Sequence, residues 1–234
     1  MELPKTVGVM ILPSVNLFPH AVLPLFIYEP RYRRMLRDAL ESHRMFCVAM
    51  QRPDRNDESP TQVAGLGVIR ASVEHPDGTS NMILQGLTRV TVGRVFRRRP
   101  YRVHCVQPLV AVSPDSARVD ALVDKVRELV NERFRKGLPG ALKFLGEDKT
   151  LGKSKGQSVE SILRSMADVA DASVLADLVS CTLLPDPRQR QVMLETVDVE
   201  TRLRYLICFL IKEEERARGG PGTGNSGPAS KAGD

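Results

Sequence analysis

The chain has 234 residues, of which 42% are hydrophobic and only 5% aromatic, and it contains no Trp. This length gives room for one large domain or two small ones, with a core built mainly from aliphatic side chains. The net charge of +6 is below the charge density expected of a dedicated nucleic-acid-binding protein.

The first informative stretch is residues 12–32, which carries four prolines, each beside apolar residues. Proline fixes φ and donates no backbone hydrogen bond, so the interior of a regular sheet does not tolerate this density. The stretch predicts a strand at 7–12 and then a bulged or edge strand at 21–28. A helix should open at Pro30, which suits a first helical turn. One face of this helix is predicted to be buried, because apolar residues recur at helical spacing: Tyr32, Met35, Leu36, Ala39 and Leu40.

The rest of the first half is predicted to be β-rich. A strong hairpin signal lies at Pro76-Asp77-Gly78, and Gly86 suggests a bulge or a sharp bend in the strand that follows. A polar loop is expected at 51–61. Short bulged strands with a single helix favour a small closed or partly closed barrel. The further strands are predicted at 45–50, 65–75, 79–90, 92–96 and 101–112.

The second half is predicted to be helical, starting at Ser113-Pro114. Asp186 followed by a proline and Gln189 is typical of a capping box, and Asp198 is expected to cap the last helix. Apolar stripes predict helices within 119–134, 159–166 and 175–182, and a last helix whose core face comprises Leu203, Leu206, Ile207, Leu210 and Ile211. Residues 140–157 lack any period and are expected to form a flexible insert, and residues 219–234 a disordered tail.

The N-terminus and the cysteines indicate the cellular compartment in which the protein is expected. No apolar run has the length of a signal peptide or of a membrane span. The four cysteines have no pairing spacing, which predicts reduced thiols. We therefore expect a cytoplasmic protein that does not contact a membrane.

Three stretches of the sequence resemble one known family. The opening LPSVNLFPHAVLPLFIYEPRYRRML is similar to the start of the N-terminal domain of ATP-dependent Lon proteases. The segments at 65–69, 77–78 and 83–90 resemble the middle strands of that domain, and 191–203 resembles its closing helix pair. The resemblance implies an α+β fold, with a bulged, PUA-like β pseudobarrel and one helix over residues 1–112, followed by an α-helical bundle over 113–218 packed on it. It also implies a role in binding polypeptide.

No enzyme chemistry is expected from the residues. The segment nearest to a phosphate loop, 146–154, has five residues between its glycines, whereas a Walker A loop needs four. No His or Cys pair has the spacing of metal ligands, so no metal and no cofactor are predicted. Lon proteases continue into ATPase and peptidase domains, and no segment here resembles them. We expect a free-standing, non-enzymatic binding protein that acts as an adaptor or client-binding protein in proteolysis or quality control.

The expected partners are unfolded or exposed polypeptide segments, together with a protease or chaperone. For any one apolar residue of the opening stretch, burial in the core is the competing and favoured interpretation. The predicted polypeptide-binding set is Phe18, Pro19, Pro24, Leu25, Phe26, Glu29, Pro30, Arg31, Tyr32 and Arg34.

The alternative function is RNA binding by a barrel protein. Arginine beside an aromatic residue can hold a phosphate and stack on a base, and several arginines lie close to Tyr101 in the sequence. The modest charge and the absence of an RNA-binding signature make nucleic acid the less favoured partner. The predicted anion-binding set is Arg97, Arg98, Arg99 and Arg102.

Overall fold

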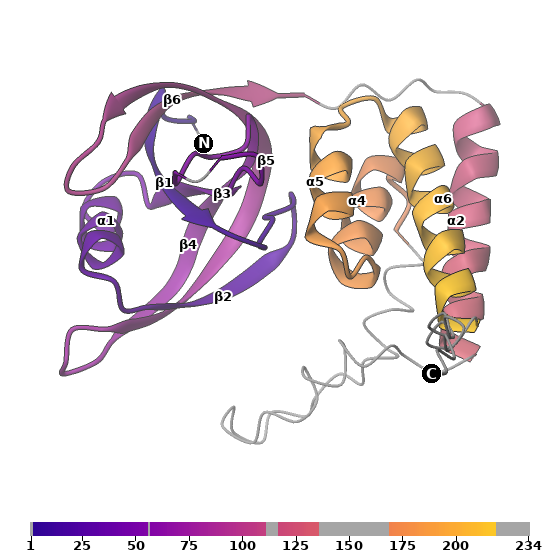
Figure 1. The fold of residues 1–234 in the computed structure, drawn as a ribbon, viewed down its shortest axis with the longest axis horizontal. Helices are drawn as coiled ribbons and strands as arrows, with labels where there is room; N and C mark the ends of the chain where they lie inside the picture. The colour runs from indigo at the N-terminus through magenta and orange to yellow at the C-terminus, as the bar shows by residue number, and fades with distance from the viewer. Residues whose placement is uncertain (1, 56, 111–116, 136–168, 219–234) are drawn as a thin grey trace, which may run out of the picture.

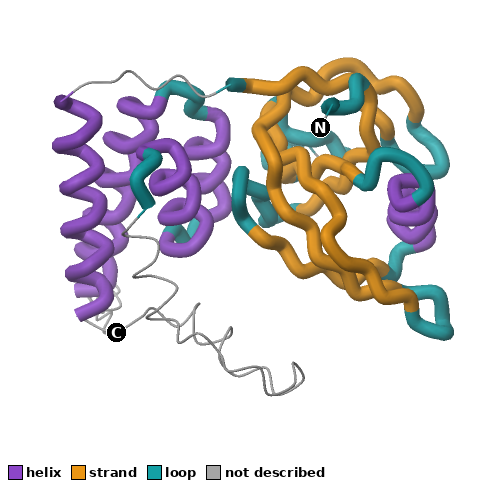
Figure 2. Tube along the Cα trace, turned by 180° about the vertical axis from the view of Figure 1, so that it is seen from behind, coloured by secondary structure: helices purple, strands orange, loops and turns teal. Residues whose placement is uncertain are grey.

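The computed structural model describes residues 2–55, 57–110, 117–135 and 169–218. A lobe built from the strands and one helix lies beside a lobe built from the remaining helices, as Figure 1 and the reverse view in Figure 2 both show. The described part of the chain thus has an α+β fold. The elements are β1 (Thr6–Leu12), β2 (Val22–Ile27), α1 (Pro30–Leu40), β3 (Met45–Met50), β4 (Val63–Glu74), β5 (Ser80–Arg97), β6 (Val103–Leu109), α2 (Ala117–Arg135), α4 (Ala172–Leu183), α5 (Pro187–Glu195) and α6 (Val199–Arg218).

The strands form one sheet in the order β2-β5-β4-β3-β1-β6, with a further pairing between β5 and β6. The β1–β3 pair is parallel and the other pairs are antiparallel. These pairings connect β1, β3, β4, β5 and β6 into a closed ring of five strands. Strand β2 lies outside this ring and pairs with β5 alone among the described strands.

Strand β5 corrects one sequence prediction. Two strands, at 79–90 and 92–96, were expected, but a single strand runs from Ser80 to Arg97. Its first part pairs with β2 and β4 and its last part pairs with β6. The strand is therefore long enough to pair with β4 on one side and with β6 on the other. The curl that this requires comes from register shifts along the strand.

A register shift lies at Gly86, where a bulge or a sharp bend was predicted, and the structure shows why glycine is needed there. One register shift of the β4–β5 pair lies at Gly86, between the pairs Leu66–Thr88 and Gly67–Gly86. A Cβ atom at Gly86 would lie 1.9 Å from the carbonyl oxygen of Phe18. The segment before β2 thus crosses the sheet in direct backbone contact, and this contact fixes where β2 begins.

Helix α1 follows the prediction. Pro30 lies in its first turn, and Tyr32, Met35, Leu36 and Ala39 are buried against the sheet. The Tyr32 hydroxyl accepts a hydrogen bond from the Ile11 amide at 3.2 Å and lies 3.3 Å from the Ile11 carbonyl oxygen. This fixes the N-terminal end of α1 against β1.

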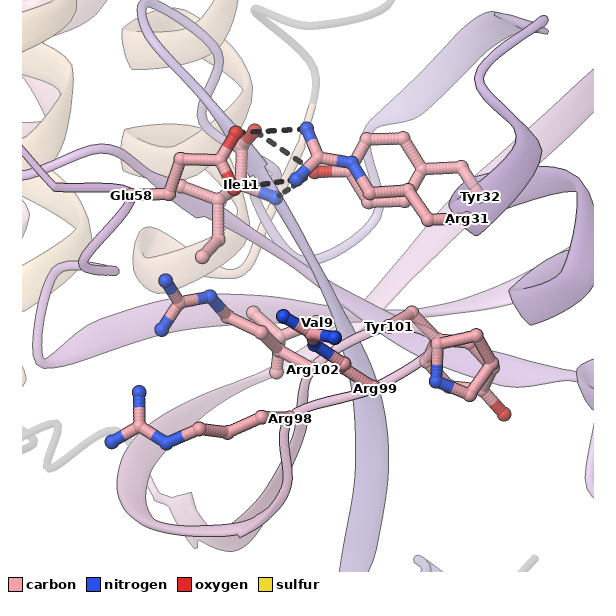
Figure 3. Close-up of a pocket in the computed structure, with 10 residues that line it drawn as sticks. Val9, Ile11, Arg31, Tyr32, Glu58, Arg98, Arg99, Tyr101 and Arg102 are labelled. Carbon is pink, nitrogen blue, oxygen red and sulfur yellow. Dashed lines mark hydrogen bonds and ion pairs between the residues drawn. The ribbon is translucent and has the colours of Figure 1, made fainter.

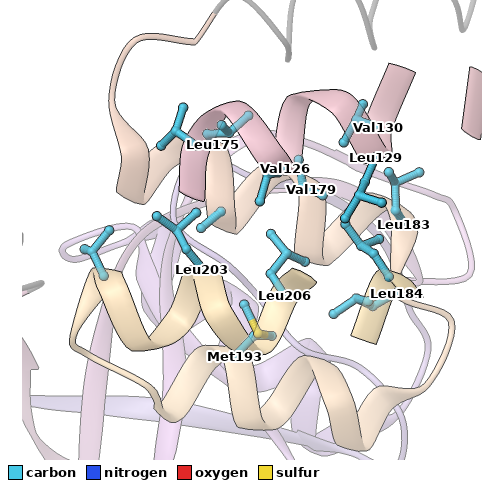
Figure 4. Close-up of a cluster of buried hydrophobic side chains, with 14 of the residues drawn as sticks. Val126, Leu129, Val130, Leu175, Val179, Leu183, Leu184, Met193, Leu203 and Leu206 are labelled. Carbon is cyan, nitrogen blue, oxygen red and sulfur yellow. The ribbon is translucent and has the colours of Figure 1, made fainter. Parts of the chain in front are cut away.

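The helical lobe is held by one apolar core, to which α2, α4, α5 and α6 all contribute (Figure 4). Leu203, Leu206 and Leu210 of α6 are buried as predicted, whereas Ile211 is 37% exposed because it lies at the margin of the buried stripe. Asp186 caps α5 by accepting a hydrogen bond from the Arg188 amide. The reciprocal half of the capping box is absent, because the Gln189 Oε1 atom accepts no hydrogen bond among the described residues, while its Nε2 donates to Glu213.

The two lobes meet through a buried charged network. Asp177 of α4 binds Arg89 of β5 and Arg202 of α6, and all three side chains are at most 3% exposed. Burial lowers the pKa of Arg202. Phe18 also crosses between the lobes, because it packs into the core of the helical lobe. Through these contacts, buried side chains of the sheet pack directly against buried side chains of the helices.

Several predictions fall outside the described residues. They are the flexible insert at 140–157 with the loop at 146–154, the helix within 159–166 and the tail at 219–234. Among the helices that the structure describes, none combines the length and the hydropathy needed to span a bilayer.

Candidate functional site

The structure divides the predicted polypeptide-binding set into buried and exposed residues. Phe18, Pro19 and Tyr32 are buried, so these three side chains do not lie on an exposed surface as the prediction required. Phe18 is part of the helical core, and Tyr32 is held by the backbone of Ile11. The remaining members of the set are exposed or half-buried: Pro24, Leu25, Phe26, Glu29, Pro30, Arg31 and Arg34.

The exposed members on β2 belong to a larger apolar surface. Residues alternate along this strand, so Val22, Pro24 and Phe26 are exposed while Leu23 and Leu25 turn inward. Cross-strand partners project from the same side of a sheet, and Pro24 pairs with Ile83, which in turn pairs with Ala71 of β4. We call this surface the apolar strand face, and it consists of Val22, Pro24, Phe26, Ala71, Val73 and Ile83.

Two aromatic groups extend this surface. The Tyr28 ring stacks on Phe26 with the ring centroids 6.1 Å apart, and the His75 ring lies 6.4 Å from Phe26. Phe26 is 56% exposed and Tyr28 is 62% exposed. Sequence reasoning found Pro24 and Phe26 but missed Val73 and Ile83, because their position beside β2 depends on the strand register.

A second feature is a cavity of about 200 Å³ beside the N-terminal end of α1 (Figure 3). Arg31 and Tyr32 line it together with three members of the predicted anion-binding set. Arg97 is the exception, because its guanidinium lies 4.8 Å from the centre of the Tyr101 ring and does not line the cavity. We call this cavity the arginine pocket, and it is lined by Val9, Ile11, Arg31, Tyr32, Glu58, Arg98, Arg99, Pro100, Tyr101 and Arg102.

One arginine of the pocket is neutralised by carboxylates. Arg31 donates hydrogen bonds to Glu58 at 2.5 and 2.8 Å and to Glu29 at 2.8 Å. The bond with Glu58 is the main reason why the pKa of Arg31 is raised and the pKa of Glu58 is lowered. The Arg31 guanidinium also lies 4.6 Å from the centre of the Tyr32 ring.

The other three arginines of the pocket are not hydrogen-bonded to a carboxylate in the part of the chain that the structure describes, and one of them, Arg102, is attracted electrostatically to Glu58. Within the described residues, the guanidinium groups of Arg98, Arg99 and Arg102 have no hydrogen bond or ion pair with a carboxylate. Figure 3 shows all three grouped along one stretch of chain, with Arg31 and Glu58 joined by dashed lines across from them. The pocket therefore has an excess of positive charge.

Tyr101 forms a fixed wall of the pocket. Its hydroxyl donates a hydrogen bond to Asp38 at 2.7 Å, and Asp38 also accepts one from Arg34 at 2.8 Å. The bond with Tyr101 is the main cause of the lowered pKa of Asp38. Burial is the main cause of the raised pKa of Tyr101. This chain of contacts ties the loop before β6 to the exposed side of α1.

Metal chemistry has no support among the residues that the structure describes. They contain no group of three or more His, Cys, Asp or Glu side chains able to share an ion. His104 is buried with its Nδ1 atom 3.0 Å from the Gly93 carbonyl oxygen, while Cys105 is half-buried. The two adjacent residues thus differ in environment, as strand alternation predicts.

The fold of the chain is that of Lon N-terminal domains. The N-terminal domain of the Mycobacterium avium complex Lon protease superposes with a TM-score of 0.65 at 20% identity, covering 88% of this chain and 98% of that one. A Lon N-terminal domain protein from Xanthomonas campestris gives a TM-score of 0.58, also at 20% identity. It covers 88% of this chain and 99% of that one.

The chain belongs to the family described as the ATP-dependent protease La (LON) substrate-binding domain, whose model matches residues 6–212. It is 23% identical to a Lon protease of Dictyoglomus thermophilum over 92% of its own length and 28% identical to Lon protease 2 of Herpetosiphon aurantiacus over 89%. The matched region is 25% and 24% of those two proteins. The chain thus spans about a quarter of the length of these relatives.

Proposed function

We propose that this chain is a non-enzymatic module that binds unfolded or exposed polypeptide segments through the apolar strand face. The observation that carries the proposal is the set of large apolar side chains left exposed on three adjoining strands, Phe26 at 56%, Val73 at 63% and Ile83 at 41%. Exposed apolar side chains gathered on one face of a folded protein, here around the polar Asn81 that pairs with both Phe26 and Val73, typically mark an interaction site. Membership of a family described as substrate-binding supports the same function.

The geometry of β2 favours an extended polypeptide as the ligand. Among the strands that the structure describes, β2 is the last in the sheet order and pairs with β5 alone, so its outer edge has no strand partner there. An exposed edge can accept an added strand, in which main-chain hydrogen bonds give affinity and side-chain contacts give selectivity. Pro24 interrupts this edge because it has no N–H, which also discourages unlimited edge-to-edge pairing.

The expected affinity is modest. Apolar burial contributes about 25 cal/mol per Å², and the loss of translational freedom and the ordering of a flexible ligand offset much of this gain. Weak binding with rapid release suits a module that samples many polypeptides. We further propose that the protein works as an adaptor or client-binding protein with a protease or chaperone, and that its curled sheet is a PUA-like pseudobarrel.

The test replaces one exposed phenylalanine on the apolar strand face and a matched one elsewhere. Phe26 and Phe96 are both exposed strand residues, at 56% and 65%, but Phe96 lies outside the apolar strand face. Binding of a fluorescently labelled unfolded polypeptide should weaken several-fold with Phe26→Ser and remain unchanged with Phe96→Ser. Equal affinities for the two variants would contradict the proposal, provided that circular dichroism shows both to be folded.

RNA binding is the second candidate, and the arginine pocket is the observation that favours it. The salt dependence of the binding affinity distinguishes RNA binding from polypeptide binding. Affinity based on phosphate contacts falls steeply as salt rises, because counterions are released on binding. Affinity based on apolar contact persists in salt, so binding of the unfolded polypeptide should survive a salt titration that abolishes binding of a single-stranded RNA.

A further inference from the structure

We propose that the arginine pocket binds an oxyanion carried by the bound polypeptide, either a carboxylate or a phosphate group on a side chain. This proposal rests on the proposed function, and it names the clients as segments in which apolar residues are followed by an acidic or phosphorylated residue. The apolar strand face would hold the apolar residues and the pocket would hold the anion.

The charge of the pocket supports an anionic ligand. Its lining contains four arginines and one glutamate, and the carboxylate of that glutamate is already engaged by Arg31. Among the described residues, Arg98, Arg99 and Arg102 form no hydrogen bond or ion pair with a carboxylate, and Arg102 is attracted to Glu58 only through space. A planar guanidinium offers two parallel N–H groups that match a carboxylate or phosphate, so these three side chains provide the donors that an oxyanion requires.

The walls of the pocket strengthen this interaction. Val9 and Ile11 line it as buried residues of β1, and the rings of Tyr32 and Tyr101 are also buried. Arg98 and Arg99 themselves are exposed, so the buried side chains lower the dielectric constant on one side of a bound anion while its other side stays open to water. The pocket thus offers an anion a partly shielded site.

Size and aromatic geometry favour a side chain over a nucleic acid. The cavity of about 200 Å³ is smaller than the roughly 300–1,000 Å³ that is usual for drug-sized ligands. Single-stranded nucleic acids are held by bases stacked on open aromatic faces. Here the two tyrosines that line the pocket are buried, and each already has a guanidinium over its ring, from Arg31 and Arg97.

One residue that lines the pocket, Arg31, lies close along the chain to the apolar strand face. Arg31 follows Phe26 by five residues, and an extended chain spans at most about 3.6 Å per residue. The two Cα atoms are therefore within about 18 Å of each other. A client segment of five or six extended residues covers that distance.

The test uses three labelled peptides that differ at one position. Each has the same apolar segment, followed several residues later by Glu, Gln or phosphoserine. Fluorescence polarisation at low salt should show the wild-type protein binding the Glu or the phosphoserine peptide roughly tenfold more tightly than the Gln peptide, as expected for charge-assisted hydrogen bonds. Whichever of the two gains affinity identifies the source of the oxyanion.

Two double variants locate the effect. Arg98→Gln with Arg99→Gln should abolish the preference for the anionic peptide. Arg37→Gln with Arg94→Gln removes the same charge from exposed arginines outside the pocket and should leave the preference intact. Phe26→Ser should weaken all three peptides alike, because it acts on the apolar strand face.

Equal binding of the three peptides to the wild-type protein would overturn the pocket proposal while leaving the proposed function in place. An equal loss in both double variants would overturn it as well, because the effect would then reflect net charge alone. Displacement of the anionic peptide by a single-stranded RNA at a lower concentration than by an unlabelled copy of the peptide would reassign the pocket to nucleic acid. If no peptide binds at all, the proposed function itself fails, and the pocket proposal fails with it.

Discussion

Glu58 is the residue that reduces the positive charge of the arginine pocket. It is the only carboxylate in the lining, and it accepts two hydrogen bonds from Arg31. Glu29 binds the same guanidinium, so Arg31 is held by two carboxylates and only part of its donor capacity depends on Glu58. The positive charge that the pocket offers to an anion therefore comes mainly from Arg98, Arg99 and Arg102.

The pH dependence of stability follows from this ion pair. Arg31 lowers the pKa of Glu58 below its ordinary value of 4.5, so the folded state holds the proton less tightly than the unfolded state. The stabilisation is therefore fully present above about pH 4.5 and is lost as the pH falls through the folded-state pKa. Because Glu58 is 43% exposed, the contribution should be at most about 1 kcal/mol.

The measurement is the free energy of urea unfolding of the wild type and of Glu58→Gln across this pH range. The wild type should be slightly more stable near neutral pH, and the difference should vanish at acidic pH. A difference that grows as the pH falls would contradict the assignment of the ion pair.

Among the elements, α1, the 76–78 hairpin and the buried stripes of α2 and α4 could be predicted from local signals. Prolines, turn residues and apolar periodicity act within a few residues of one another, so sequence alone contains them. The continuous strand β5 and the apolar strand face could not be predicted in this way. Both depend on which residues of distant strands lie opposite each other, and register is set by closure of the whole sheet.

The same limit applies to single site residues. Phe18 and Phe26 look alike in the sequence: Phe18 precedes Pro19 directly, and a single residue separates Phe26 from Pro24. Phe18 is fully buried in the helical core, whereas Phe26 lies on the outer side of β2. Phe18 is buried because it contacts helical residues about a hundred or more positions away in the sequence. A local sequence pattern cannot predict such a contact.

Gly86 provides a test at the level of the element. A methyl group there would lie 1.9 Å from the Phe18 carbonyl oxygen, a backbone atom that cannot move alone. Gly86→Ala should therefore destabilise the fold by about 1–3 kcal/mol, as overpacking of a tight site does. The matched control is Gly93→Ala in the same strand, where the nearest atom would be 3.2 Å away and the cost should be smaller. Equal denaturation midpoints for both variants would argue against the crossing of the 18–21 segment over β5.

In the molecule as a whole, the sheet and the helices are joined by Asp177 and its two arginines. Arg89 comes from the strand lobe and Arg202 from α6, so a single carboxylate on α4 connects three elements. The arginines are further satisfied by carbonyl oxygens, including those of Leu194 and Thr196. A buried network of this kind contributes specificity only while all of its members are present.

Removing the central carboxylate should weaken the whole protein. Asp177→Asn leaves two buried guanidinium charges facing each other without a counter-charge, and such a loss typically costs about 3–5 kcal/mol. The surface control is Asp124→Asn, whose carboxylate is 76% exposed, and it should change the free energy of unfolding by no more than about 0.5 kcal/mol. Chemical denaturation of the two variants gives the comparison. Similar losses would show that the network does not hold the lobes together.

The central claim is that the outer edge and exposed face of β2 bind polypeptide, and hydrogen–deuterium exchange with and without a saturating apolar peptide tests it most directly. If a client strand adds to this edge, the amides of Val22–Ile27 other than Pro24, which has none, should exchange more slowly when the peptide is bound, because they become hydrogen-bonded or shielded from water. Strand β3 lies inside the sheet between β4 and β1 and should be unchanged, which makes it the internal control. Unchanged exchange at Val22–Ile27, with protection appearing elsewhere in the chain, would contradict the account.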